Sequence, residues 1–331
     1  MSRTKVLFAY CHELDRCLSI DEARTEFFSK KPQDRQRFTF SCSDRNCNVT
    51  ISGVNYHVKA EDGEKFKVAH FRSPHPHNLG CEWMQFSEEA NQPRQASETE
   101  ADYTERKARQ KLNDFINCFD PCTDETDSGQ KKTGQLTSLS QVNHLVKDND
   151  LSNDKSHKWS RYTRTNQLQR LVDTWQEAKK TLTYDEFRTL KLRVTNYGKV
   201  YFHEYITHIQ KGLKNQYEGV IFGGGSLVKR YGRGFLIHFF DKHNDKPIRL
   251  YIDKNLMEKG RFSHYIDEIL STENVRYFRV FLLNPEVSEK KTELASQLST
   301  LRYQACDNWR FTTNSTLLKI MILFDSSMLN L

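Results

Sequence analysis

Two pairs of soft metal ligands constrain how the N-terminal part of the chain can fold. Cys42 and Cys47 are separated by four residues, and about thirty residues later His77 and Cys81 are separated by three. Three thiolates and one imidazole match the tetrahedral nitrogen and sulfur ligands of structural zinc sites. Four protein ligands leave no open coordination position for catalysis. The pattern therefore predicts a structural Zn²⁺ held by Cys42, Cys47, His77 and Cys81.

Two other imidazoles near the second pair are rival ligands. His70 and His75 belong to the stretch "HFRSPHPHNLGCEW", residues 70–83, and His75 stands between two prolines, where an exposed loop residue is expected. His77 has the preferred spacing, because two ligands four positions apart fit one helical turn or a tight loop. The alternative to a metal site is a set of isolated reduced cysteines with polar histidines around them.

Three short segments around these ligands predict a small antiparallel β meander. The segments "QRFTFSC", "CNVTISGVNYHVK" and "EKFKVAHFR" alternate apolar and polar residues and are rich in Thr, Val and Phe. Turn-forming residues such as Asp-Arg-Asn and Glu-Asp-Gly lie among them. A module of about 60 residues that is poor in aliphatic side chains has a small core, so a metal staple meets a practical need.

The same segments carry a family resemblance. "FTFSCSDRNCNV" followed by "VAHFRSPHPHNLGCEW" resembles the N-terminal zinc-binding region of competence protein CoiA-like proteins, and "ETEADYTERKARQKL" is similar to the helix that follows there. The resemblance covers about residues 36–107 and implies a zinc-binding module in a prokaryotic protein linked to DNA handling or mobile-element defence. Tyr103 and Glu105 stand where the family has a histidine, so no nuclease residue is carried over.

Composition divides the whole chain into three predicted domains of the α+β class. Residues 1–97 form the zinc-binding β module, 98–191 contain helices and a polar flexible linker over 123–158, and 192–331 form a basic domain of strands and helices. Good helix formers fill 98–117, and apolar residues recur with a helical period over 166–191.

The last domain has the element order of an OB-fold barrel. Three successive strands over about 218–253, a helix and two further strands are expected, and a further helix over about 289–304 departs from that order. The cluster Gly223–Gly225 falls on the first strand, where a barrel strand would need a bulge to bend. A generic α+β sheet is the alternative to the mixed barrel.

Charge and cysteine usage bound the class of protein. Residues 161–331 hold 27 Lys and Arg against 18 Asp and Glu, a balance of +9, whereas residues 1–160 hold 23 against 25, a balance of −2. No apolar run approaches the roughly 18 residues of a transmembrane helix, and the N-terminus does not read as a secretory signal. We therefore expect a cytoplasmic protein with no membrane partner, whose eight cysteines are reduced.

The basic half predicts contacts with a polyanion. Lys and Arg are interleaved with Tyr and Phe between residues 191 and 233, and this combination neutralises a phosphate backbone while bases stack on the rings. We predict binding of single-stranded DNA or RNA. The residues assigned to this contact are Lys199, Lys214, Lys229, Arg230, Tyr231 and Arg233. The alternative is a solvated basic face over a core that contains half of the aromatic residues.

Catalytic motifs fail on spacing. His203 and His208 are five positions apart, where a zincin helix needs four, and "FGGGSLVKRYGRG" lacks the lysine and glycine positions of the phosphate-binding loops. We therefore favour a non-enzymatic nucleic-acid-binding or accessory protein. Two alternatives are a protein-docking subunit of a larger defence or DNA-processing assembly and a divergent nuclease. The roles of Cys11, Cys17, Cys118 and Cys122 stay open.

Overall fold

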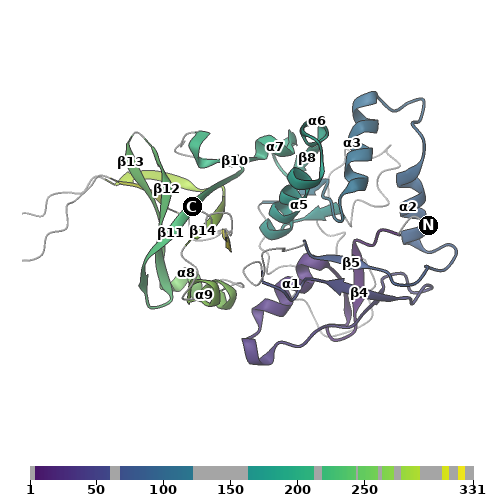
Figure 1. Ribbon diagram of the computed structural model, residues 1–331, viewed down its shortest axis with the longest axis horizontal. Coiled ribbons are helices and arrows are strands. Elements are labelled where there is room, and N and C mark those ends of the chain that lie inside the picture. Colours follow the sequence, from purple (N-terminus) through teal and green to yellow (C-terminus); the bar gives the residue numbers. More distant parts are fainter. Residues whose placement is uncertain are drawn as a thin grey trace, which may run out of the picture. The chain divides into compact units, whose positions relative to one another are not determined.

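The structure, a computed structural model, consists of two compact units. The described residues are 4–59, 68–121, 163–211, 218–243, 245–259, 263–271, 277–290, 308–312 and 320–324. The N-terminal unit comprises residues 1–27, 32–58 and 67–203, and the C-terminal unit comprises 28–31, 59–66 and 204–331 (Figure 1). The predicted linker over 123–158 lies outside the described residues. None of the helices in the described ranges combines the length and apolarity needed to cross a membrane.

A five-stranded antiparallel sheet forms the first layer of the N-terminal unit, in the order β2-β1-β3-β4-β5. Its strands are β1 (Phe8–Cys11), β2 (Arg16–Ser19), β3 (Phe40–Cys42), β4 (Thr50–Val54) and β5 (His70–Arg72). The strands β3, β4 and β5 confirm the predicted meander. The hairpin β1–β2 extends it, because β1 pairs with both β2 and β3.

Helices and a second, mixed sheet complete this unit. The helices are α1 (Ile20–Ser29), α2 (Glu82–Asn91), α3 (Glu100–Lys111), α5 (Leu168–Thr181) and α6 (Tyr184–Thr189), with a 3₁₀ turn at Pro32–Asp34. The second sheet has the order β7-β6-β8-β9, with β6 (Cys118–Phe119), β7 (Arg164–Thr165), β8 (Lys191–Val194) and β9 (Gly198–Tyr201). Helices were predicted over 98–117 and 166–191, and α3, α5 and α6 confirm both.

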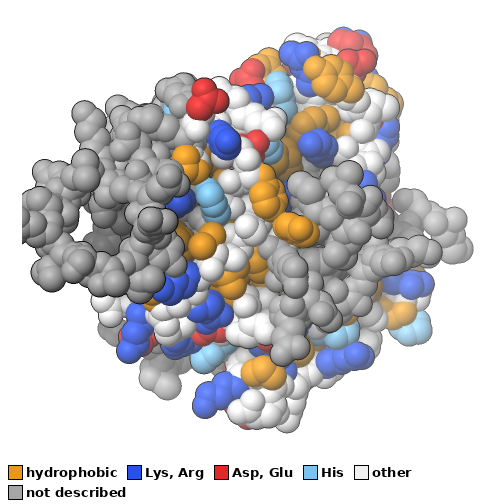
Figure 2. Space-filling view, turned by 60° about the vertical axis from the view of Figure 1, so that its left-hand side comes forward, with side chains coloured by type: hydrophobic (Ala, Val, Ile, Leu, Met, Phe, Trp, Pro, Cys, Tyr) orange, Lys and Arg blue, Asp and Glu red, His pale blue; other side chains and the backbone are white. Residues whose placement is uncertain are grey.

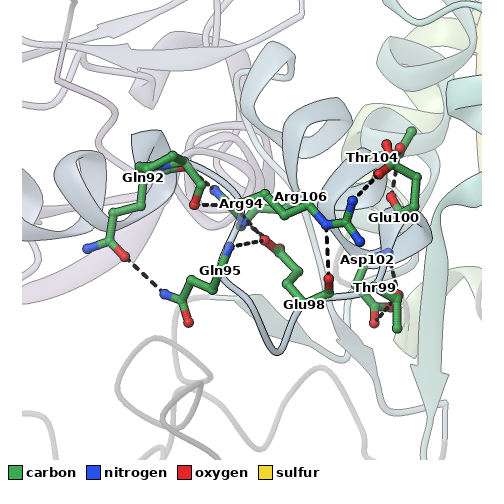
Figure 3. Close-up of polar contacts among 10 residues, drawn as sticks. Gln92, Arg94, Gln95, Glu98, Thr99, Glu100, Asp102, Thr104 and Arg106 are labelled. Carbon is green, nitrogen blue, oxygen red and sulfur yellow. Dashed lines mark hydrogen bonds and ion pairs between the residues drawn. The ribbon is translucent and has the colours of Figure 1, made fainter.

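The connection between α2 and α3 is fixed by one guanidinium group. Arg106 Nε and Nη2 each lie 2.8 Å from a carboxylate oxygen of Glu98, and Nη1 donates to the Gln92 carbonyl at 3.0 Å (Figure 3). Thr99 caps α3, since its hydroxyl accepts from the Asp102 N–H at 3.2 Å. The arginine thus orders the end of α2 and the start of α3 together.

A cluster of buried charges lies between α1 and α5. Arg170 forms two hydrogen bonds with Asp114, with Nε–Oδ2 at 2.8 Å and Nη2–Oδ1 at 2.9 Å. Asp21 is hydrogen-bonded to Asp173, and burial, followed by the negative charges of Asp173 and Asp114, raises the pKa of Asp21 well above its ordinary value. Arg24 donates to three main-chain carbonyls, the shortest bond being 2.6 Å to Val58. The Asp21–Asp173 hydrogen bond thus joins α1 to α5, and Arg24 joins α1 to the chain that follows β4.

An open sheet of eight strands forms the C-terminal unit. The order is β15-β16-β13-β12-β11-β14-β17, and β10 also pairs with β11. The strands are β10 (Ile206–His208), β11 (Val220–Tyr231), β12 (Gly234–His243), β13 (Lys246–Ile252), β14 (Tyr277–Leu283), β15 (Glu286–Lys290), β16 (Asn308–Thr312) and β17 (Ile320–Phe324). Its helical elements are α7 (Phe202–Tyr205, which begins in the N-terminal unit), a 3₁₀ turn at Ile209–Lys211, α8 (Lys254–Lys259) and α9 (Ser263–Ser271).

The α+β class is confirmed, but the predicted barrel is not found. A barrel requires the strands at the two ends of the sheet to pair, and within the described residues β15 and β17 end the path without meeting. The helix expected over 289–304 begins instead as β15, and residues 291–304 lie outside the described residues. Gly223 and Gly225 mark close packing rather than a bulge, since a methyl group on Gly225 would lie 2.7 Å from the His238 carbonyl oxygen.

The substitution Asp21→Asn tests the buried charge cluster. The raised pKa means that Asp21 stabilises the fold most at pH values below about 4, and that this contribution is lost as pH rises through the folded-state pKa. Asparagine does not titrate, so the variant should be more stable than wild type by about 1 kcal/mol or more at pH 8. Thermal unfolding from pH 5 to pH 8 measures the difference. The exposed residue Asp34 supplies the control Asp34→Asn, and identical pH profiles for wild type and Asp21→Asn would contradict the assignment.

Candidate metal centre and sheet surface

Four ligand atoms of the N-terminal unit converge on one point. The Sγ atoms of Cys42, Cys47 and Cys81 and an imidazole nitrogen of His77 all lie within 4.8 Å of one another, and all four residues are buried. His77 Nδ1 is 3.5 Å from Cys42 Sγ, 3.3 Å from Cys47 Sγ and 3.4 Å from Cys81 Sγ. The cluster could therefore hold one metal ion.

The distances within the cluster fit a tetrahedral ion. With metal–sulfur bonds of about 2.3 Å and a metal–nitrogen bond of about 2.0 Å, neighbouring ligand atoms are about 3.5–3.8 Å apart. The three sulfur–nitrogen distances match this, as does the distance of 3.7 Å between Cys42 Sγ and Cys81 Sγ. A disulfide would need about 2.05 Å. The donors are thus placed to share an ion rather than to bond to each other.

The first two ligands come from the turn between β3 and β4. Cys42 is the last residue of β3, and its N–H donates to the Val49 carbonyl at 2.7 Å, so the chain returns on itself. Cys47 lies inside this turn and donates to the Asp44 carbonyl at 3.0 Å. Asn48 has a φ of 48°, a conformation that asparagine tolerates better than most residues. Both thiols therefore point to the same side of a tight turn.

The other two ligands lie at the entry to α2. Cys81 is the N-cap of α2, and Gly80 before it has a φ of 84°, which favours glycine. Asn78 joins the two halves of the cluster: its side-chain nitrogen donates to the Asn46 carbonyl at 3.0 Å, and its main-chain N–H donates to Cys47 Sγ at 3.4 Å. Hydrogen bonds from Asn78 thus hold the segment of His77 and Cys81 against the turn that carries Cys42 and Cys47.

A further network links the turn to α2 behind the cluster. The Glu82 N–H donates to Asp44 Oδ2 at 2.9 Å, so a carboxylate from the turn caps the helix. Trp83 is fully buried, and its indole N–H donates to Ser43 Oγ at 2.9 Å, which in turn donates to Glu82 Oε1 at 3.0 Å. Sequence reasoning missed these residues. The Asp-x-Asn turn and the Trp next to Glu82 were the available signals.

Burial sets the protonation of the ligands in the metal-free centre. It raises the pKa of the Cys81 thiol to about 11 and raises that of Cys42 well above its ordinary value. It lowers the pKa of His77, so the imidazole is neutral at physiological pH. Because Nδ1 faces the thiols, the ring proton belongs on Nε2, which is buried and has no hydrogen-bond partner within the described residues. A metal ion would replace the thiol protons and bind the free Nδ1.

The rival ligands and the other cysteines among the described residues lie outside the cluster. The His70 ring shares a hydrogen bond with the Val68 carbonyl at 3.0 Å, and His75 is exposed. Cys11 is buried in β1, whereas Cys17 and Cys118 are half-buried in β2 and β6. Cys122 lies outside the described residues, and no second metal cluster occurs among those that are described.

The predicted nucleic-acid contacts fall in two different units. Lys229, Arg230, Tyr231 and Arg233 share the β11–β12 hairpin, whereas Lys199 lies on β9 of the N-terminal unit. Lys214 lies outside the described residues.

Two of the hairpin residues are held by one carboxylate. Arg230 Nη2 lies 2.6 Å from Asp267 Oδ1, and Arg233 Nε lies 2.9 Å from Asp267 Oδ2. Asp267 belongs to α9, so these ion pairs tie the hairpin to that helix. A phosphate group would have to compete with the carboxylate for both guanidinium groups.

The other two residues lie on the opposite face of β11. Successive strand residues point to opposite faces, so Lys229 and Tyr231 share a face and Arg230 between them does not. Lys229 Nζ lies 5.2 Å from the Tyr231 ring centroid, within the range of a cation–π contact, and Tyr231 is 43% exposed. From here on, the face that carries Lys229 and Tyr231 is called the open face of the sheet. Asp267 of α9 contacts Arg230 on the other face.

A β-bulge determines this assignment. Leu227 pairs with Ile237, but the next pair is Lys229 with Leu236, so Val228 is an extra residue on β11. If Val228 paired with Leu236 in a regular ladder instead, Lys229 would fall on the other face.

Glu105, one of the two residues that stand where the CoiA-like family has a histidine, does not belong to an accessible site. Glu105 is buried in α3, where Oε1 accepts the Lys191 N–H at 2.8 Å and pairs with Arg109. These contacts join α3 to β8 and give Glu105 a structural part.

Comparison with known proteins finds no matching protein family, no significantly similar curated protein and no significantly similar solved structure. The resemblance to CoiA-like proteins over residues 36–107 stays a prediction.

Proton release on metal binding tests the geometry of the cluster. At pH 7.5 the thiols of Cys42 and Cys81 carry protons in the metal-free centre and lose them on binding, whereas neutral His77 has none to lose from Nδ1. We expect Zn²⁺ to displace about two protons or more, and its apparent affinity to rise roughly 100-fold per pH unit between pH 6 and pH 8. Calorimetry in buffers of different ionisation enthalpy measures the release. Fewer than about one proton per ion would contradict the proposed ligands.

Proposed function

We propose that the chain is an accessory protein that binds nucleic acid through its C-terminal unit and is held in shape by a structural Zn²⁺ in its N-terminal unit. The observation that carries the nucleic-acid part is the open face of the β11–β12 hairpin. On this face Lys229 stands over the exposed Tyr231 ring. Arg230 and Arg233 are instead paired with Asp267. A cation beside an exposed ring is the combination that contacts phosphates and bases of a single strand.

The donor set supports zinc over other ions. Thiolate and imidazole ligands suit zinc, whereas magnesium and calcium prefer oxygen ligands. The four protein ligands would close the coordination shell, and the cluster is buried, which supports a structural rather than a catalytic ion. A prokaryotic role in DNA handling or mobile-element defence, implied by the resemblance to CoiA-like proteins, is consistent with a nucleic-acid partner.

Elemental analysis of the purified chain tests the zinc. We expect about one zinc per chain, and we expect Cys42→Ser or Cys81→Ser to lose it together with the folding of residues 36–90. Cys17→Ser is the matched control, because Cys17 lies in the same sheet outside the cluster. A stable protein without metal would refute the proposal.

Titration of labelled single-stranded DNA and RNA at two salt concentrations tests the partner. Binding should weaken with salt, because cationic side chains release counterions from phosphates. Lys229→Gln should lower the slope of log affinity against log salt by about one. Lys254→Gln is the control, because Lys254 on α8 is exposed and pairs with Glu258. Absent or salt-independent binding would disprove the nucleic-acid function.

A further inference from the structure

A row of side chains crosses the open face of the C-terminal sheet. Tyr277 of β14 pairs with Ser226 of β11, Ser226 pairs with His238 of β12, and His238 pairs with Arg249 of β13. Paired residues of neighbouring strands point to the same face. Since strands are about 4.8 Å apart, the row is about 14 Å long.

Two aromatic pairs lie along this row, and one of them includes its end residue, Tyr277. Phe240 packs against Tyr277 with ring centroids 5.6 Å apart, and Tyr231 packs against Tyr251 with centroids 5.8 Å apart. Phe240 is 45% exposed and Tyr231 is 43% exposed, so each pair presents a ring to solvent. Tyr251 pairs with Leu236, four residues before Phe240, which places the two pairs roughly 13 Å apart along β12.

The charge of this face is positive. Arg249 lies in the row, and its guanidinium group has no hydrogen bond or ion pair with another side chain of the described residues. Lys229 stands beside one aromatic pair, over the Tyr231 ring. The alternate positions of β11, β13 and β14 that share the open face hold no Asp or Glu. Asp241 of β12 lies beside the face, where its Oδ2 is 3.9 Å from His208 Nε2.

Figure 2 shows the surface with the side of the C-terminal unit turned forward. Lys, Arg and His side chains lie there among hydrophobic side chains, rather than in a separate charged patch. Bases have apolar faces and their backbone carries one negative charge per phosphate, so a strand of nucleic acid requires both kinds of contact within a short distance.

We infer that the open face binds single-stranded nucleic acid by stacking bases on the Tyr231–Tyr251 and Phe240–Tyr277 pairs while Arg249 and Lys229 contact phosphates. This inference rests on the proposed function and adds the mode of binding and the preferred form of the ligand. In a duplex the bases stack on each other, so their faces are not available to protein rings. A surface that works by stacking therefore prefers single strands.

Three labelled probes of equal length test the inference with the full chain: oligothymidylate, a strand of abasic deoxyribose phosphates, and a duplex. We expect oligothymidylate to bind about tenfold or more tighter than the abasic strand, because only it can stack, and tighter than the duplex per binding site. Fluorescence anisotropy at one salt concentration gives the affinities.

Three variants separate stacking from charge. Phe240→Leu should weaken oligothymidylate binding by about fivefold to 100-fold and leave the abasic strand unchanged. Arg249→Met should weaken both strands. Arg230→Met should weaken neither, because Arg230 lies on the other face and pairs with Asp267. Circular dichroism checks that each variant is folded, and Tyr231→Leu replaces Phe240→Leu if the latter does not fold.

The outcomes distinguish the two proposals. Equal binding of oligothymidylate and the abasic strand would overturn the stacking surface and leave nucleic-acid binding standing. Duplex binding as tight as single-strand binding would do the same. If none of the probes binds, the proposed function falls as well, and a protein partner for the aromatic pairs becomes the better hypothesis.

Discussion

Three buried thiols and one buried imidazole meet at one point in the N-terminal unit. Two segments of the chain bring them together. The β3–β4 turn supplies two of them, and the entry to α2 supplies the others. Burial raises the pKa of the Cys42 and Cys81 thiols, so these two carry protons without a metal ion and would lose them on binding one. The hydrogen bonds of Asn78 and Asp44 join the same two segments. A bound metal ion would therefore act at the same place as the hydrogen bonds that join α2 to the β3–β4 turn.

The spacing of the ligands was enough to predict the cluster, because two of its contacts are local in sequence. The supporting residues were harder to predict. Asp44 caps a helix that begins about forty residues later, and Asn78 reaches back to Asn46. The hairpin β1–β2 was also missed, because strands of four residues carry too little alternation to identify them. Contacts of this kind depend on the fold being formed and leave no periodic pattern.

In the C-terminal unit the strands were predicted more readily than the way they assemble. The order of three strands, a helical segment and a further strand is present, but closure into a barrel depends on the distant strands β15 and β17. The interleaved basic and aromatic residues likewise led us to assign four residues of the hairpin to one nucleic-acid contact. It could not show that Asp267, more than thirty residues further along, takes up two of them.

Val228, the extra residue of the β11 bulge, determines which side chains of the hairpin tip lie on each face of the sheet. Because Val228 is unpaired, Lys229 and Tyr231 lie on the open face, and Arg230 lies on the other face, where it pairs with Asp267 of α9. If β11 ran on without the bulge, so that Val228 paired with Leu236, Lys229 would pair with Phe235 on the other face and Arg230 would take a place on the open face. The pairing of one residue in β11 thus decides which side chains the hairpin tip offers to a partner, without any substitution at the tip itself.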